Sequence, residues 1–88
     1  MNYESAFTPT FQKLLRKLDK PIQERVLKAI DDVLKEPRKG SQLVFAKHVC
    51  FKWRIGDYRM MYTVDERRLI VTFIVVGHRS GVYKRHRL

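Results

Sequence analysis

The sequence has a single cysteine, few glycines and prolines, and no long apolar run. With Cys50 alone, no internal disulfide can form, which suits a reducing compartment. Four glycines and three prolines in 88 residues exclude a collagen-like or low-complexity chain. The longest apolar stretch, 69–77, is about half of the ~20 residues needed to span a bilayer. Residues 1–5 lack the basic flank and apolar stretch of a signal peptide, so we expect a cytoplasmic protein that does not contact membranes.

Groups that could hold a metal ion are also scarce. His48, His78 and His86 do not fall at the spacings of known metal sites. Cys50 lies in an apolar run, where a lone cysteine is more often a small core residue than a nucleophile. We therefore expect a protein that acts without a metal or cofactor, and on no small-molecule substrate.

Acidic residues are few compared with basic ones. Nineteen Lys and Arg against nine Asp and Glu give a formal charge of +10 at pH 7. Such an excess weakens the folded state by self-repulsion, so it indicates an anionic partner. The charge by itself does not distinguish nucleic acid, an anionic membrane surface and an acidic protein as that partner. Solubility alone is a poorer explanation, because acidic residues serve that purpose better.

The spacing of apolar residues changes from a helical to a strand period along the chain. Residues 2–7 are expected to form a short strand, and Thr8-Pro9 and Asp19-Lys20-Pro21 read as the starts of two helices. The second helix is expected to end at Glu36-Pro37. Four strands are predicted after a loop over 37–42, at 43–48, 49–55, 58–64 and 69–77. The sequence thus predicts an α+β fold with two N-terminal helices packed on one face of a mainly antiparallel sheet of four or five strands.

This reading makes the whole chain, 1–88, one domain. Its parts are a first strand and helical hairpin over 1–36, the antiparallel sheet over 43–79 and a basic tail over 80–88.

The hairpin around Gly56-Asp57 gathers basic residues. Glycine at the first central position permits a two-residue type II′ turn, which sets Arg54 opposite Arg59 and Lys52 opposite Met61. Side chains alternate across a strand, so one face carries the apolar residues Phe51, Trp53, Ile55, Tyr58, Met60 and Tyr62. The other face, here called the cation face, carries Lys52, Arg54 and Arg59. Two arginines directly opposite each other destabilise a sheet by some tenths of a kcal/mol to about 1 kcal/mol, so a bound phosphate is a plausible reason for the pair. The alternative is that these are solvated positions.

The end of the last predicted strand adds a second basic group. Strict alternation would place His78 on the cation face, whereas Arg79 needs a bend at Gly77 to join it.

Two stretches together carry a family resemblance. Residues 50–62, which include Gly56-Asp57-Tyr58-Arg59, and the terminal Gly77-His78-Arg79 with Val82-Tyr83 resemble the RelE/ParE superfamily of toxins from toxin–antitoxin modules. The resemblance implies a ribosome-dependent nuclease that cuts messenger RNA and is silenced by a small, RelB-like antitoxin. The partners it implies are therefore that antitoxin, the ribosome and mRNA. It also implies catalytic roles for Lys52, Arg54, Arg59, Arg79 and Tyr83. Lys47, His78, Lys84 and Arg85 are assigned to RNA binding.

The implied chemistry needs no metal, because RNA supplies its own 2′-hydroxyl nucleophile. The protein has to orient that group, accept its proton and stabilise charge on the phosphate. Tyr83 is expected to act as general base or as a stacking platform, with His78 as the alternative acid or base. On this view Arg59→Ala and Arg79→Ala should each abolish cleavage and leave the fold intact. Two other functions stay open: a ParE-like gyrase inhibitor that cleaves nothing, and a non-catalytic nucleic-acid-binding module.

Overall fold

The computed structural model describes residues 2–45 and 48–81 of the chain. The elements, in chain order, are β1 (Glu4–Phe7), α1 (Pro9–Arg16), α2 (Lys20–Lys35), the 3₁₀ turn η1 (Pro37–Lys39), β2 (Ser41–Phe45), β3 (His48–Ile55), β4 (Tyr58–Asp65) and β5 (Ile70–His78). Among these residues, no helix is long and apolar enough to cross a bilayer.

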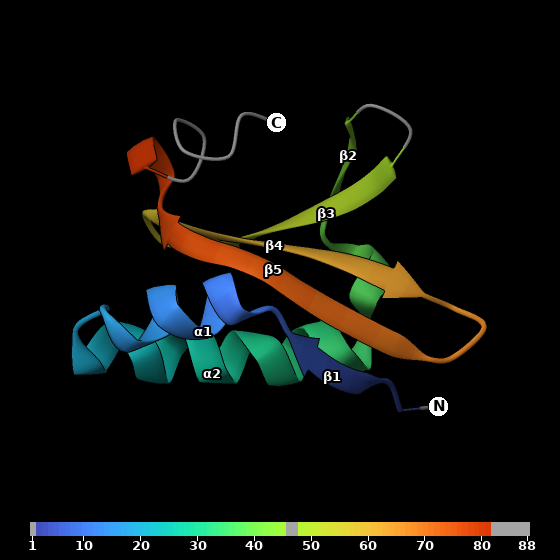
Figure 1. Cartoon of the computed structure of the whole chain (residues 1–88), viewed down its shortest axis with the longest axis horizontal. Coiled ribbons are helices and arrows are strands. Elements are labelled where there is room, and N and C mark those ends of the chain that lie inside the picture. The colour runs from blue at the N-terminus through green and yellow to red at the C-terminus, as the bar shows by residue number, and fades with distance from the viewer. Residues whose placement is uncertain (1, 46–47, 82–88) are drawn as a thin grey trace.

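The strands form one sheet in the order β1-β5-β4-β3-β2, with α1 and α2 side by side on one of its faces (Figure 1). β1 pairs with β5 in parallel, and the other neighbours are antiparallel. The predicted α+β fold with a mainly antiparallel sheet is therefore confirmed.

Some predicted strand limits were wrong by one to three residues. β1 starts at Glu4 rather than at residue 2, and β3 starts at His48 rather than at residue 49. The predicted loop over 37–42 contains η1, and β2 already begins at Ser41, because Ser41 pairs with Lys52 of β3. These ends depend on pairing across the sheet, which the apolar period of one strand does not encode.

The two helices begin where their capping residues predict. Thr8 has an extended backbone, and its Oγ1 accepts a hydrogen bond from the Phe11 N–H at 3.0 Å. The following Pro9 occupies the first turn of α1, where a missing N–H does no harm. α2 starts after Asp19, and its predicted apolar stripe contributes Val26, Ala29, Ile30 and Val33 to the core, all buried.

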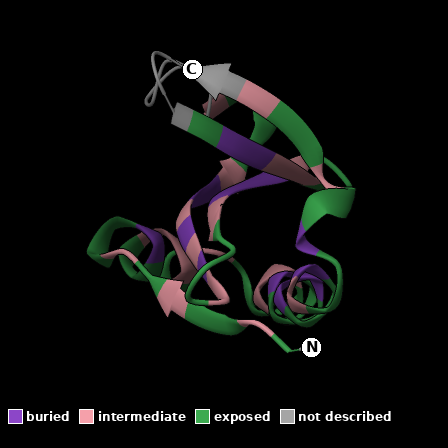
Figure 2. Ribbon diagram, turned by 90° about the vertical axis from the view of Figure 1, so that its right-hand side faces the viewer, coloured by how far each residue is buried: buried purple, intermediate pink, exposed green. Residues whose placement is uncertain are grey.

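The core lies between these helices and the helix-facing side of the sheet. Figure 2 shows the buried residues on the inner strands and on the inward side of a helix. From the sheet, the cluster contains Phe51, Ile55, Met60, Tyr62, Val71, Phe73 and Val76. Trp53 and Tyr58 pack against it, so the apolar face predicted for the hairpin is the one that the helices cover.

A buried tyrosine fixes η1 to the sheet. The Tyr62 hydroxyl, on β4, donates a hydrogen bond to the Pro37 carbonyl at 2.6 Å, and burial raises the pKa of Tyr62 to about 12. Gly40 passes so close that a Cβ there would lie 2.9 Å from the Lys52 carbonyl and would also overlap the Tyr62 hydroxyl. The tight passage at Gly40 thus leads β2 directly to the edge of β3, beside Lys52.

Candidate nucleic-acid interface

The β3–β4 hairpin has the predicted turn and register. Gly56 has φ of +60°, whereas Asp57 does not have a positive φ, which is the pattern of a type II′ turn. Arg54 lies opposite Arg59, and Lys52 lies opposite Met61. Because paired residues share a face, Lys52, Arg54 and Arg59 belong to the same side of the sheet, away from the helices. The predicted cation face is therefore present in the fold.

The two opposed arginines have different surroundings. Arg54 is exposed, whereas Arg59 is only 9% exposed. The Arg59 Nη1 donates hydrogen bonds to the Gly56 carbonyl at 2.9 Å and to the Tyr58 carbonyl at 3.0 Å. In the described part of the chain, neither arginine has a carboxylate oxygen within 4.0 Å. The charge of the pair is thus not neutralised by a described acid, and the Arg59 guanidinium is held in place by the turn.

These hydrogen bonds give Arg59 a structural role that the sequence analysis missed. The expectation that Arg59→Ala leaves the fold intact stays a prediction, but that substitution removes two hydrogen bonds at the hairpin turn and should therefore lower stability. The only sequence signal was an arginine three residues after a turn glycine, which is too common to be diagnostic.

The cation face is not polar throughout. Met61, the neighbour of Lys52 across the hairpin, is 1% exposed, and it clusters with Val75, Leu43 and Ile74. Cys50 is also buried, and burial raises the pKa of its thiol. A buried thiol with a raised pKa is a poor nucleophile, so the expected core role of Cys50 is confirmed.

A β-bulge in β5 decides where Arg79 lies. Met61 pairs with Val75 and Tyr62 pairs with Phe73, so Ile74 is an extra residue that inverts the alternation beyond it. Gly77 then lies opposite Arg59, and the Arg79 N–H donates to the Asp57 carbonyl at 2.9 Å. The backbone of Arg79 thereby lies beside the hairpin turn, and its side chain is exposed. The predicted bend at Gly77 was wrong, because the bulge at Ile74 provides the shift.

Thr8, which directly follows β1 beside β5, supports this bulge. Its hydroxyl caps α1 and donates to the Ile74 carbonyl at 2.7 Å. One side chain thus joins the start of the first helix to the irregularity that places Arg79.

The bulge moves His78 off the cation face. His78 lies opposite Tyr58 on the helix-facing side, where the two rings meet edge to face with centroids 5.5 Å apart. Its Nδ1 is 2.9 Å from the Ser80 hydroxyl, and the Ser80 N–H donates to the same atom at 3.3 Å. The placement of His78 that strict alternation gave was therefore wrong, and its role in RNA binding stays a prediction.

Four predicted site residues lie outside the described residues: Lys47, Tyr83, Lys84 and Arg85. Their assigned roles stay predictions.

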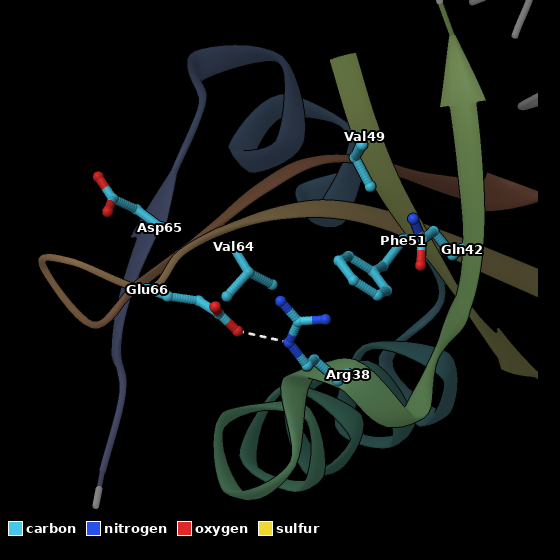
Figure 3. A pocket seen from close by; sticks show the side chains of 7 residues that line it. All are labelled: Arg38, Gln42, Val49, Phe51, Val64, Asp65 and Glu66. Atoms are coloured by element: carbon cyan, nitrogen blue, oxygen red, sulfur yellow. Dashed lines mark hydrogen bonds and ion pairs between the residues drawn. The ribbon is translucent and has the colours of Figure 1, made fainter.

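A different cavity, of about 560 Å³, opens on the helix-facing side between η1 and the far ends of the strands. Figure 3 shows Phe51 and Val64 in its wall and the Arg38 side chain reaching across it to Glu66. This ion pair lowers the pKa of Glu66. Because the Arg38 charge is paired and the walls are partly apolar, the cavity is a poorer phosphate site than the cation face.

The comparisons with known proteins agree with this fold. Residues 6–83 match the family described as the ParE toxin of the type II toxin–antitoxin system parDE. The chain belongs to the RelE/ParE toxin superfamily. It is similar to the toxin RelG of Mycobacterium tuberculosis, with 34% identity over 87 residues that cover 97% of this chain and all of RelG. It is also similar to the mRNA interferase toxin RelE of Escherichia coli K12, with 31% identity over 94% of this chain and 92% of RelE.

Solved structures give the same result. The RelBE2 toxin–antitoxin complex of M. tuberculosis contains a chain that aligns with a TM-score of 0.81 and 33% identity, covering 90% of this chain and 100% of that one. The isolated E. coli RelE toxin aligns with a TM-score of 0.76 and 30% identity, over 93% of this chain and 92% of RelE. The protein is thus a RelE-like toxin of the type II toxin–antitoxin class.

Proposed function

We propose that this RelE-like toxin is a ribosome-dependent, metal-independent endoribonuclease that cleaves mRNA and so inhibits translation. The observation that carries the proposal is the cation face, where Arg54 and Arg59 oppose each other without a described carboxylate within 4.0 Å. The Arg79 backbone is bonded to the turn beside them, and its side chain is exposed. The likeness to a protein named mRNA interferase supports the same activity.

The arrangement suits attack of a 2′-hydroxyl on the adjacent phosphate. Lys52 and Arg54 are assigned to the scissile phosphate and Arg59 to the charge that develops on it. The buried Arg59 guanidinium is already oriented by two carbonyls, so little reorganisation is needed when the phosphate becomes more negative. Arg79 is assigned to the leaving group or to a neighbouring phosphate, as an electrostatic partner rather than a proton donor, because guanidinium pKa values exceed about 12.

Proton transfer is assigned to Tyr83, with His78 as the alternative. Because a base with an ordinary tyrosine pKa near 10 is weak, the catalytic set is incomplete on free RNA. Binding in a ribosome could supply the missing in-line geometry. The proposed partners are the ribosome, its mRNA and a RelB-like antitoxin. The antitoxin is supported by the similarity to toxin chains found in RelBE complexes.

The test is mRNA cleavage in a translating extract, read by primer extension. The informative variants are Arg54→Ala and Arg79→Ala, whose side chains are exposed and make no described hydrogen bond. We expect each to lower the cleavage rate about 10²–10³-fold. Arg67→Ala is the matched control, because it removes an exposed arginine from the β4–β5 turn at the opposite end of β4. Wild-type cleavage by both site variants would reject the proposal.

Gyrase inhibition is the second candidate, favoured by the match to the ParE toxin family. It predicts DNA breaks in cells that carry the toxin, with messages left intact. The same cultures can be scored for both outcomes.

A further inference from the structure

A small cavity of about 300 Å³ lies where α2 meets the edge of β3. The lining residues are Arg25, Lys28, Ala29 and Asp32 from α2, and Trp53, Arg54 and Ile55 from β3. β2 begins at Ser41, opposite Lys52, so none of its residues pairs with 53–55. Residues 53–55 of β3 therefore form an edge that β2 does not cover, and α2 lies beside it.

The cavity carries an excess of positive charge. Arg25, Lys28 and Arg54 are exposed cations, and Asp32 is the carboxylate in the lining. In the part of the chain that the structure describes, none of the three cations has a carboxylate oxygen within 4.0 Å. Three cations gathered in this way repel one another, and an anion between them would reverse the sign of that interaction.

The cavity also adjoins the cation face. Arg54 belongs to both, since it lines the cavity and lies opposite Arg59. Arg25 reaches the hairpin turn itself, because a Cβ on Gly56 would lie 2.8 Å from its Nη2. Basic residues thus lie on both sides of the turn, Arg59 on β4 and Arg25 on α2, while the turn itself carries the exposed acid Asp57.

We propose that Arg25 and Lys28, together with Arg54, bind the RNA backbone at a second phosphate position beside the cleavage site. In this arrangement the RNA chain crosses the cation face, passes over the unpaired edge of β3 and contacts α2. This rests on the proposed function in taking RNA as the ligand. A repeating polyanion can contact cations on both the hairpin and α2, whereas a single carboxylate of a protein partner would need only one of these groups.

The test is the salt dependence of binding to a fluorescent single-stranded RNA of about 12 nucleotides, 2′-O-methylated so that it cannot be cleaved. Each phosphate contact contributes roughly 0.7 to the slope of log K against log salt for single strands. Arg25→Gln and Lys28→Gln should each lower that slope by about 0.7, and Asp32→Asn should tighten binding. The controls are Arg67→Ala, which removes an equal charge elsewhere, and Asp31→Asn, which neutralises the exposed acid next to Asp32. All these side chains are exposed, so unfolding midpoints should stay at the wild-type value.

A second arm uses purified ribosomes and measures how much toxin sediments with them. Loss in both arms supports contact with the message strand, and loss only with ribosomes supports contact with ribosomal RNA. Both outcomes support the proposal, because the ligand of Arg25 and Lys28 is an RNA phosphate in each case.

The proposal is overturned if Arg25→Gln and Lys28→Gln keep the wild-type slope and ribosome binding, or if they weaken only the binding of an acidic antitoxin. Should Arg54→Ala and Arg79→Ala still abolish cleavage in that case, the second phosphate position alone fails and the nuclease function stands.

Discussion

Arg59→Ala should destabilise the toxin, while Arg54→Ala should not, although the two arginines oppose each other in one hairpin. A hydrogen bond from a charged donor contributes about 1.5–3 kcal/mol, and Arg59 makes two. Water can reach the exposed turn and replace part of this, and losing the repulsion from Arg54 returns up to about 1 kcal/mol. We therefore expect the free energy of unfolding to fall by about 2–3 kcal/mol, a large part of the 5–15 kcal/mol of a typical domain.

Urea unfolding followed by circular dichroism and by Trp53 fluorescence measures this difference. With a slope of about 1–3 kcal/mol per molar urea, the midpoint of Arg59→Ala should fall by about 0.7–3 M. Arg54→Ala, exposed and without a described hydrogen bond, should stay within about 0.5 kcal/mol of wild type. Equal stabilities for the two variants would refute the assignment of Arg59 to the turn. A loss of cleavage by Arg59→Ala must accordingly be measured at a temperature where the variant is folded.

Two further predictions concern the supports of the site. Thr8→Val removes the cap of α1 and the hydrogen bond to the Ile74 carbonyl, so the free energy of unfolding should fall by about 1–3 kcal/mol. The amide hydrogen of Arg79 should also exchange faster, because the bulge that leads to it loses a support. A wild-type midpoint for Thr8→Val, next to a Thr10→Val control on the exposed side of α1, would contradict this. The pKa of Tyr62 is about 12 in the folded chain and about 10 in the unfolded chain. Its contribution to the free energy of unfolding is therefore complete below pH 10 and is lost as the pH rises towards 12. Tyr62→Phe should lower the free energy of unfolding by about 1–3 kcal/mol at neutral pH, because the Pro37 carbonyl loses its donor. It should also remove the part of the stability loss above about pH 10 that comes from Tyr62 ionisation. A variant whose stability falls between about pH 10 and 12 as steeply as that of the wild type would argue against this.

The local patterns of the sequence determined the order of the elements and the hairpin. Capping at Thr8, the change from a helical to a strand period and the glycine at position 56 act over a few residues, so they can be read without a structure. Because a two-residue turn fixes its own register, the sequence also determined which side chains share the cation face.

Only the tertiary structure decided what lies beside that face. The bulge at Ile74 depends on the match between β4 and β5 and on a hydroxyl from Thr8, 66 positions away in the sequence. It sets the Arg79 backbone beside the hairpin turn and puts His78 on the helix-facing side. The approach of Arg25 to Gly56 depends likewise on how α2 packs against β3, and the burial of Arg59 depends on how its side chain folds back onto the turn carbonyls. Alternation along a strand is a local rule, and one inserted residue reverses it for everything that follows.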